Sequence, residues 1–331
     1  MSHTASVDVL VISGADVRRL LPMSDCIPLV ESAMRTVSRG GAQLPLRIGV
    51  SPVGTQNKMV VMPGYLDEPT AMGAKVIAVY PGNARRGLSS HMGVVVLFDV
   101  REGVPLAMID AASITGLRTA AATAVATRAL SPDDSCDLAI IGSGEQAAAH
   151  LHAISLVRRL RSIRVWGRSR DHVHTFAERE AKSVDCRIAV CGSIRDALVG
   201  ADIVCTTTSS REPIVQGAWV ARGAHVNLVG ASTVNAREVD DALVKQSSFF
   251  VDYRPSALSQ AGELLEAMGA DAASHIRGEI GEVLNGAVAG RTDEFEITVY
   301  KSLGIAAQDL VTAQEVYRRA KADGTGVRAK L

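Results

Sequence analysis

The chain has 331 residues and a mass of 34.8 kDa, which exceeds one ordinary domain, so its length predicts two domains. Its 35 basic and 35 acidic residues cancel, so no net charge favours nucleic acid or an anionic membrane surface. The 5 cysteines are an odd number without C-x-x-C spacing, which argues against a disulfide framework and against a zinc site, and we expect no metal.

The N-terminal segment MSHTASVDVLV lacks a basic region followed by a long apolar stretch, so it is not typical of a secretory signal. No segment approaches about 18 uninterrupted apolar residues, the length that a membrane-spanning helix needs. We therefore expect a soluble, cytoplasmic protein with no nucleic-acid or membrane partner.

The first part of the chain has the pattern of a β-rich module. A short strand is predicted over 7–12, followed by a helix from Ser24 to about Arg39 that Ser24 caps and Gly40-Gly41 ends. Breakers such as Pro63-Gly64 then separate strand-like runs. These runs cover residues 46–50, 58–62, 71–79, 94–99 and 105–109. Strands without helices between them do not predict a doubly wound sheet.

A long alanine-rich helix over 113–130 leads into a second module, in which strands and helices alternate. Strands are predicted near 138, 163, 187, 202, 225 and 248, and this alternation is what a parallel α/β sheet requires. A final helix from Gly304 to about Ala322 is expected to pack back on the first module. The tail from Asp323 to Leu331 is expected to be frayed.

The segment DLAIIGSGEQAAAH, residues 137–150, carries the strongest functional signal. An apolar run breaks into Gly142-Ser143-Gly144 and reopens as an alanine-rich helix, which is the pattern of a strand, a phosphate-binding turn and a helix. Gly142 permits the tight turn, Gly144 permits close approach of a pyrophosphate, and Ala147 keeps the helix near the sheet. A second strand follows at 163–166. The context favours a Rossmann dinucleotide site over a glycine-rich structural turn.

The residues after Trp166 bear on which dinucleotide is bound. An acidic side chain there would bind the ribose 2′-hydroxyl of NADH, but this chain has Gly167-Arg168-Ser169-Arg170. Because an arginine and a hydroxyl at this strand end suit a 2′-phosphate, Arg168 and Ser169 favour NADPH over NADH. The alternative is a solvated turn beside an NADH site.

Two later strands end in small polar residues, in the segments ADIVCTTTSS and GAHVNLVGAST. Open α/β sheets bind ligands at the carboxyl ends of their strands. We therefore expect Thr206, Asn227, Val229 and Ser232 to line the nicotinamide pocket. Satisfied loop hydroxyls are the alternative.

Cations in apolar surroundings are the candidate chemistry of the first module. Lys75 lies inside the apolar strand of GAKVIAVYPGN, and Arg118 lies at the start of the alanine-rich helix. A buried charge is costly unless it is paired, so each meets either a distant carboxylate of the protein or an anionic ligand, and we favour the ligand. Arg47 alternates with apolar neighbours and faces either the site or solvent. His91, at a strand start, is either a proton donor or a structural residue.

Several blocks of the chain, in order, resemble the ornithine cyclodeaminase/μ-crystallin family over nearly its whole length. These blocks are LPLR, GAKVIAVYPGN, GLSSHMGVVVLFD, ITGLRTAAATAVATRAL, IIGSGEQAAAH, WGRS, GAHVNLVGAS and YKSLGIAAQDL. The resemblance implies an α/β fold and a homodimer. Residues 1–125, joined by the helix 304–331, would form the β-rich α+β domain for substrate binding and dimerisation. Residues 126–303 would form the Rossmann domain that presents NADPH or NADH across a cleft.

The resemblance also assigns roles to single residues. Arg47, Lys75 and Arg118 would contact the substrate carboxylate. Together with the residues found from the pattern alone, the predicted cofactor contacts are Ser90, Arg118, Thr119, Gly142, Gly144, Glu145, Gln146, Arg168, Ser169, Thr206, Asn227, Val229, Ser232 and Ser302.

One departure from the family pattern points to the reaction. Ornithine cyclodeaminases resemble each other in an aspartate within a V-G-G-D turn, where this chain has Val229-Gly230-Ala231-Ser232. Deaminating cyclisation needs a carboxylate to manage protons, and a serine at neutral pH cannot replace it. The Gly-Ala-Ser version is similar to that of the ketimine reductases of the family.

The sequence therefore predicts an imine reductase, in which NAD(P)H reduces the C=N bond of a small α-imino acid, a cyclic ketimine or iminosuccinate, to an amino acid. Lys75 is the first candidate proton donor, because burial beside Arg118 would lower its pKa toward neutrality, and His91 is the second. The alternatives are an alanine-dehydrogenase-like or ornithine cyclodeaminase activity and, in another class, a non-catalytic protein of μ-crystallin type that binds NADPH or a small ligand.

Overall fold

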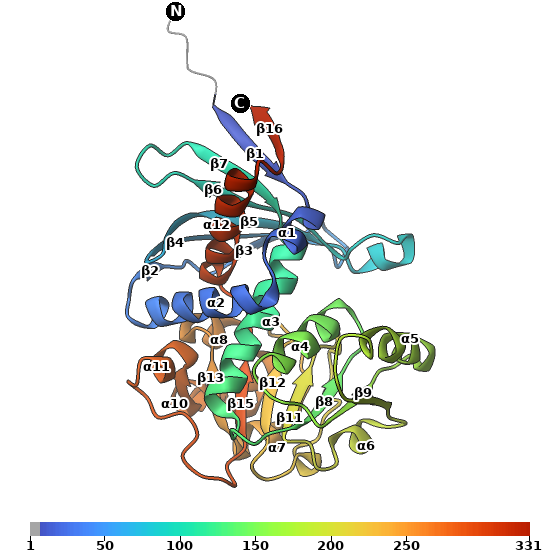
Figure 1. Cartoon of the computed structure of the whole chain (residues 1–331). Coiled ribbons are helices and arrows are strands. Elements are labelled where there is room, and N and C mark those ends of the chain that lie inside the picture. Colours follow the sequence, from blue (N-terminus) through green and yellow to red (C-terminus); the bar gives the residue numbers. More distant parts are fainter. Residues whose placement is uncertain (1–6) are drawn as a thin grey trace, which may run out of the picture. The chain divides into compact units, whose positions relative to one another are not determined.

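The computed structural model describes residues 7–331, without the side chains at 84 and 85 (Figure 1). The first six residues, which belong to the segment on which the expectation of no secretory signal depends, lie outside the described part. The chain divides into two compact units, which we describe separately: unit 1 contains the residues up to Arg118 together with Ile305–Leu331, and unit 2 contains Thr119–Gly304. Among the described residues, no helix has the length and apolar character to cross a membrane.

Unit 1 is built on an eight-stranded sheet in the order β16-β1-β7-β6-β5-β4-β2, with β3 also paired to β4. Neighbouring strands are antiparallel, except for the parallel pair β1 and β7. The strands are β1 (Asp8–Ile12), β2 (Ala42–Gln43), β3 (Ile48–Val50), β4 (Lys58–Asp67), β5 (Thr70–Val79), β6 (His91–Phe98), β7 (Pro105–Asp110) and β16 (Val327–Lys330).

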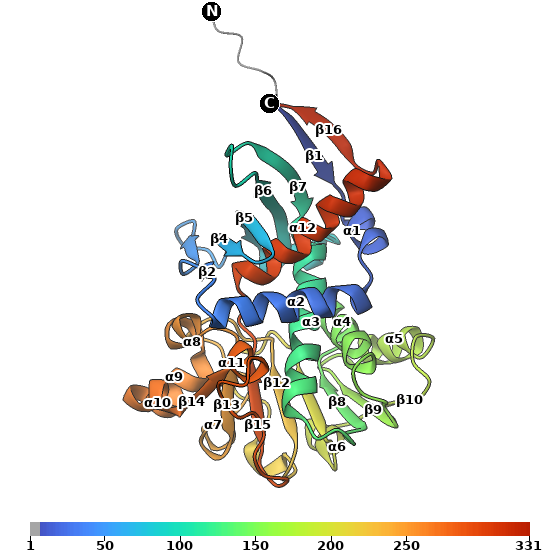
Figure 2. The ribbon, with the colours of Figure 1, turned by 60° about the vertical axis from the view of Figure 1, so that its left-hand side comes forward.

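Helices cover one face of this sheet. Helix α12 contacts β4, β5 and β6 and is in turn contacted by α2, as Figure 2 shows. The close approach depends on Gly64 and Gly73, because a Cβ at Gly64 would lie 2.9 Å from the Cβ of Ala306 and one at Gly73 would lie 3.0 Å from Leu310. The helices of the unit are α1 (Gly14–Leu20), α2 (Met23–Ser38), the 3-10 helix η1 (Pro81–Arg86), α12 (Ala306–Asp323) and the first part of α3 (Ala111–Leu130), which continues into unit 2.

Two local predictions for unit 1 were wrong. Helix α2 begins one residue early, with Pro22 as its N-cap, and Ser24 makes no capping bond. Strand β4 continues through Pro63-Gly64, which had been taken as a breaker. Proline is tolerated there because β3 pairs with β4 at 59–61 and β2 pairs with it at 65–66, so Pro63 lies in the gap between them, where no ladder bond is needed on that edge.

The C-terminal tail is also ordered rather than frayed. Helix α12 ends at Gly324, whose φ of 68° suits the left-handed helix end, and residues 327–330 then pair antiparallel with β1. Val11, for example, lies opposite Val327. The tail therefore completes the sheet as its edge strand.

Unit 2 is a doubly wound sheet, as predicted. Its eight strands are all parallel, in the order β10-β9-β8-β11-β12-β15-β13-β14. The strands are β8 (Asp137–Ile141), β9 (Ser162–Trp166), β10 (Arg187–Val190), β11 (Ile203–Thr206), β12 (His225–Leu228), β13 (Ser248–Val251), β14 (Ile276–Glu279) and β15 (Thr298–Lys301). The helices are α4 (Glu145–Ser155), α5 (Arg170–Glu180), α6 (Ile194–Leu198), α7 (Asp241–Gln246), α8 (Arg254–Gln260), α9 (Gly262–Met268), α10 (Ala272–His275), α11 (Ile280–Leu284) and the 3-10 turns η2 (Gly217–Trp219) and η3 (Gly269–Asp271).

Successive residues of the central strand β8 enter two different cores. Leu138 and Ile140 pack with residues of α4 and α5 on one face, whereas Ala139 and Ile141 pack with residues of α6, α7 and α9 on the other. Burial of both faces explains why the strand is apolar without alternation. The sheet thus holds the carboxyl ends of β8, β11 and β12 in fixed, neighbouring positions.

Candidate active site

The two buried cations of unit 1 meet at a carboxylate. The Lys75 ammonium on β5 lies 2.8 Å from Oδ2 of Asp309 and donates to its Oδ1 at 2.9 Å. Arg118, on α3, donates from Nε to the same Oδ1 at 2.9 Å and from Nη1 to Oε1 of Gln308 at 3.2 Å. Lys75 also lies 3.4 Å from the hydroxyl of Thr115. One residue of α12 therefore joins a strand and a helix that are distant in the sequence.

Arg47 belongs to the same face of the sheet. Ile48 lies opposite Val61, so continuing that register by one residue places Arg47 opposite Met62, which in turn pairs with Lys75. Residues directly opposite each other in an antiparallel sheet point to the same side. Arg47 is close enough to Lys75 for its charge to affect the lysine. Arg47, Lys75 and Arg118 thus form a cluster, which we call the cation cluster.

The cation cluster brings three basic side chains to one carboxylate. Burial and the charge of Arg118 lower the pKa of Lys75 to about 7, although Asp309 opposes the change. Burial alone would raise the pKa of Asp309, but the charges of Arg118 and Lys75 lower it, so this carboxylate stays ionised. With Arg47, the cluster contains two arginines for one carboxylate even when Lys75 is neutral. The arrangement therefore suits an anionic ligand.

The structure shows one of the two partners expected for the buried cations, a carboxylate of the protein. Both Lys75 and Arg118 meet a distant carboxylate of the protein, and we had favoured the ligand. The bonds of Arg118 use Nε and Nη1, and within the described part of the chain Nη2 makes no bond, so this nitrogen can serve a ligand as well. Asp309 and Gln308 were not predicted, although a polar pair inside the apolar helix pattern AAQDLV was a usable signal.

His91 lies on the same face as Lys75 but farther along the sheet. It pairs with Val79, whereas Lys75 pairs with Val95, so four residues of strand, or about 13 Å, separate the two. The imidazole is exposed, and its Nδ1 lies 2.9 Å from the hydroxyl of Ser90. Lys75 is thus the buried candidate proton donor, and the roles of His91 and Ser90 stay predictions.

The glycine turn of unit 2 has the form that a pyrophosphate needs. Gly142 has a φ of 127°, and a Cβ there would lie 2.5 Å from the hydroxyl of Thr207, so only glycine fits. Gly144 is the N-cap of α4 without a side-chain cap, and a Cβ there would meet nothing within 4 Å. The open space lies at the positive end of a helix, where phosphate binds. These residues fit a dinucleotide cofactor.

Polar groups near this turn are also placed for a ligand. Glu145 is exposed in the first turn of α4, and Oε1 of Gln146 is buried without a hydrogen-bond partner among the described residues. At the end of β9, Arg168 is exposed, whereas Ser169 caps α5 by accepting from the amide of His172 at 3.4 Å. Ser169 therefore has a structural role, and Arg168 remains available to a 2′-phosphate.

Two predicted nicotinamide contacts use their side chains within the protein instead. The Asn227 side chain is fully buried, accepts from Nε2 of His225 at 3.1 Å and donates to the hydroxyl of Thr127 at 3.0 Å. Burial lowers the pKa of His225 to about 3, so the ring is neutral. The hydroxyl of Thr206 donates to Glu238 at 2.7 Å. Only the main chain at these two positions is left for a cofactor.

The remaining predicted cofactor residues of unit 2 are buried or half-buried. Thr119 and Val229 are buried, and Ser232 is half-buried after β12. Ser302 is 2% exposed, and its hydroxyl has no hydrogen-bond partner among the described residues, which suits a ligand contact. Their roles toward a cofactor stay predictions.

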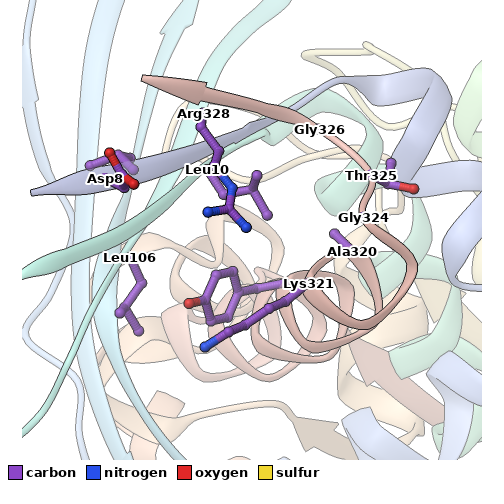
Figure 3. A pocket seen from close by; sticks show the side chains of 11 residues that line it. Asp8, Leu10, Leu106, Ala320, Lys321, Gly324, Thr325, Gly326 and Arg328 are labelled. Atoms are coloured by element: carbon purple, nitrogen blue, oxygen red, sulfur yellow. The ribbon is translucent and has the colours of Figure 1, made fainter. Parts of the chain in front are cut away.

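A separate pocket lies in unit 1 between β1, β16 and the end of α12 (Figure 3). Its lining includes Leu10, Tyr317, Lys321 and Arg328. No residue of the cation cluster lines it. Lys321 lies over the ring of Tyr317, at 6.0 Å from its centroid, so the pocket is lined by residues of the helix end and the edge strands.

Comparison with known proteins places the chain. The family model described as "Ornithine cyclodeaminase/mu-crystallin family" matches residues 7–324. The ketimine reductase mu-crystallin of Rattus norvegicus is 40% identical over 294 residues, which are 88% of this chain and 90% of the relative.

Solved structures agree with this match. The Delta(1)-pyrroline-2-carboxylate reductase of Thermococcus litoralis, in complex with NADH and L-proline, has a TM-score of 0.94 and 34% identity, covering 97% of this chain and 100% of that one. An archaeal alanine dehydrogenase dimer with bound NAD has a TM-score of 0.92 and 29% identity, covering 98% and 100%. This chain belongs to the ornithine cyclodeaminase/mu-crystallin family.

Proposed function

We propose that the protein reduces the C=N bond of a small α-imino acid to the corresponding amino acid, with NADPH or NADH as the reductant. The observation that carries this proposal is the cation cluster, in which three basic side chains lie near one carboxylate, in a family whose members include a ketimine reductase and a Delta(1)-pyrroline-2-carboxylate reductase. The dinucleotide-shaped turn at Gly142–Glu145 supports the choice of cofactor.

Each unit has a defined part in this reaction. In unit 1, Arg118 and Arg47 would hold the α-carboxylate, and orientation of the bound acid supplies much of the rate. Lys75, with its pKa lowered to about 7, would give a proton to the imine nitrogen and recover it from water. In unit 2, the glycine turn, Arg168 and the strand-end turns would hold the cofactor. A bound NAD(P)H would supply the hydride to the imine carbon.

The substrate is tested by a panel of acids. Pyrroline-2-carboxylate, piperideine-2-carboxylate, iminosuccinate and a keto acid with ammonia are each offered with NADPH and with NADH, and oxidation of the nicotinamide is followed. Ornithine is offered with NADP+ and with NAD+, and release of ammonia is followed, because cyclodeamination leaves no net change in the cofactor. Turnover with at least one preformed imino acid supports the proposal. Turnover confined to keto acid with ammonia favours an alanine dehydrogenase, which one structural relative is. Turnover confined to ornithine favours a cyclodeaminase, and cofactor binding without any turnover favours a binding protein.

Replacement of Arg168 tests the preference for NADPH. The Arg168 side chain is exposed at the end of β9, and residues 167–170 include no acidic side chain. Arg168→Ala should therefore weaken NADPH at least about tenfold, the effect of one charge-assisted bond, and change NADH by less than about twofold. Titration of cofactor fluorescence measures both affinities. Equal effects on the two cofactors would rule out a contact with the 2′-phosphate.

The protein is further proposed to form a homodimer through the second face of the unit 1 sheet. That face is apolar across neighbouring strands, with the rows Met59-Ala78-Met92, Val61-Val76-Val94, Pro63-Ala74-Val96-Met108 and Tyr65-Met72-Phe98. Met59 and Met92 are 45% and 47% exposed, and Ile48 on β3 is 63% exposed. An apolar sheet face of this kind is typical of a subunit interface.

A charge in the middle of this face should separate the subunits. Val96→Lys is expected to turn a dimer into a folded monomer, because an interface has to bury about 800 Å² on each partner without an unpaired charge. Light scattering after gel filtration gives the mass. Val199→Lys, at a 62% exposed position in unit 2, is the control and should leave the dimer intact. A monomeric wild-type chain, or a dimeric Val96→Lys variant, would refute this interface.

A further inference from the structure

Glu238 is a buried carboxylate at the carboxyl edge of the unit 2 sheet. Its Oε1 accepts from the amide and from the hydroxyl of Thr208, both at 2.7 Å. Its Oε2 accepts from the hydroxyl of Thr206 and the amide of Gly230, both at 2.7 Å, and from the amide of Ala231 at 3.3 Å. Every one of these partners donates, so the side chain acts only as an acceptor, which is the role of an ionised carboxylate.

This single side chain joins the turns that follow two neighbouring strands. Thr206 and Thr208 belong to the turn after β11, whereas Gly230 and Ala231 belong to the turn after β12. The turns also touch directly, because a Cβ at Gly230 would lie 2.0 Å from the carbonyl oxygen of Thr208. Since three main-chain amides depend on Glu238, its carboxylate sets the shape of both turns.

The glycine turn after β8 is packed against the same assembly. A Cβ at Gly142 would lie 2.5 Å from the hydroxyl and 3.1 Å from the carbonyl oxygen of Thr207, which lies between the two threonines that bind Glu238. The turns after β8, β11 and β12 therefore form a continuous edge. We call this edge the strand-end ledge, residues 142–144, 206–208 and 229–231.

A buried ion pair continues the network behind the ledge. Lys301, on β15, donates to the carbonyl oxygen of Ala231 and to Oε1 of Glu263 at 3.0 Å, and both charged side chains are fully buried. Burial raises the pKa of Glu238, while the charge of Lys301 and the hydroxyl of Thr206 oppose that rise. The positive charge of Lys301 thus favours the ionised form of this carboxylate.

The order of strands in the sheet assigns the two ends of a bound dinucleotide. The pyrophosphate belongs at the glycine turn after β8, and the adenosine ribose belongs beside Arg168 at the end of β9. Strand β9 lies on one side of β8, and β11 and β12 lie on the other. The nicotinamide half must therefore extend over the turns after β11 and β12, which are the turns that Glu238 holds.

We infer that Glu238 is a positioning residue for the nicotinamide half of the cofactor: it shapes the turns at 206–208 and 229–231 against which the nicotinamide riboside lies. The inference rests on the proposed use of a nicotinamide dinucleotide. Glu238 itself contacts the protein only, so it acts through the amides and hydroxyls that it orients.

Replacement by the isosteric amide tests this role. In Glu238→Gln an NH₂ group must face either the amide of Thr208 or the amide of Gly230, and neither amide can turn to accept. The turn that loses its acceptor is expected to shift. NADH and NADPH should then bind at least about tenfold more weakly, while ADP-ribose, which lacks the nicotinamide, should bind within about twofold of the wild-type value. Calorimetric titration of the full-length protein measures all three ligands.

Two further variants serve as a control and as a second test. Asp240→Asn is the matched control, because this nearby carboxylate also accepts two amides, from Gly217 at 2.9 Å and Leu243 at 3.0 Å, but at the start of α7. In Asp240→Asn the ratio of the affinity for NADH to the affinity for ADP-ribose should equal the wild-type ratio. If Glu238→Gln does not fold, Thr208→Val, which removes one hydroxyl donor to Glu238, should change the same ratio in the same direction by a smaller factor.

The outcomes separate the inference from the function beneath it. Selective loss of the nicotinamide dinucleotides supports the inference. Equal loss of NADH and ADP-ribose, or no loss in either Glu238→Gln or Thr208→Val, overturns it and leaves the proposed function in place. A wild-type chain that binds neither NADH nor NADPH overturns the proposed function, and the inference with it.

Discussion

Replacing Arg118 with methionine is expected to lower kcat/KM for the imino acid by roughly 10²–10³-fold, with the dinucleotide still bound. Arg118 is 4% exposed, and its guanidinium pairs with Asp309 inside the cation cluster. Removal of one partner of a buried charge pair costs about 2–5 kcal/mol, and each ~1.4 kcal/mol is tenfold. The loss should appear mainly in KM for the acid, because the guanidinium binds the carboxylate in the ground state as well as in the transition state.

The control for this variant is Arg19→Met in the same unit. Arg19 forms exposed ion pairs with Asp16 and Asp323, so its loss should change kcat/KM by less than about twofold. Steady-state kinetics measures both variants, and fluorescence titration measures NADPH binding. Unchanged reduction by Arg118→Met would show that the arginine is a structural partner of Asp309 and nothing more.

Replacing Asp309 with asparagine should lower the free energy of unfolding by about 3–5 kcal/mol, because it leaves two buried cations without a counter-charge. The loss should depend on pH. Asp309 holds the pKa of Lys75 up, so in the variant this pKa falls further below about 7 while the unfolded lysine keeps its ordinary value of 10.5. Between the pKa of Lys75 in the folded variant and its value of 10.5 in the unfolded chain, the unfolded state binds more protons than the folded state, so the free energy of unfolding rises with pH. The destabilisation should therefore be larger at pH 6 than at pH 9.

Urea unfolding at the two pH values measures this difference. The double variant Lys75→Met with Asp309→Asn removes the titrating group, so its destabilisation relative to Lys75→Met alone should not change between pH 6 and pH 9. Asp323→Asn, in an exposed ion pair at the end of the same helix, should cost less than about 1 kcal/mol at either pH. A loss for Asp309→Asn that is as small as that of Asp323→Asn would contradict the buried pairing.

Much of the fold was predictable because its signals are local. The glycine turn, the alternation of strands and helices after residue 137 and the β-rich character of the first part all depend on residues close together in the sequence. The errors came from distant pairings. Strand β16 forms only because β1, more than three hundred residues earlier, offers an edge, and Pro63 is accepted in β4 because two short strands leave a gap there.

The candidate site was predictable to a similar extent. A cation in an apolar strand or helix must be paired, and this rule predicted a partner for Lys75 and Arg118, although it favoured an anionic ligand over the carboxylate that both residues meet. The partner, Asp309, is 234 residues from Lys75 and 191 from Arg118, and no local pattern links them. Glu238 was missed for the same reason, because the five donors that surround it come from turns that meet only in the folded sheet.

The most direct test of the cation cluster follows an isotope from the cofactor to the product. NADPH or NADH that carries deuterium at the transferable position of C4 is offered with pyrroline-2-carboxylate and, in parallel, with 1-pyrroline, which lacks the carboxylate. If the cluster selects the substrate by its anionic end, mass spectrometry will show one deuterium on the carbon beside the carboxylate of the amino acid and almost none in the product of 1-pyrroline. Equal transfer of deuterium to both imines would contradict this selection. So would the absence of transfer to pyrroline-2-carboxylate and to every other imino acid offered.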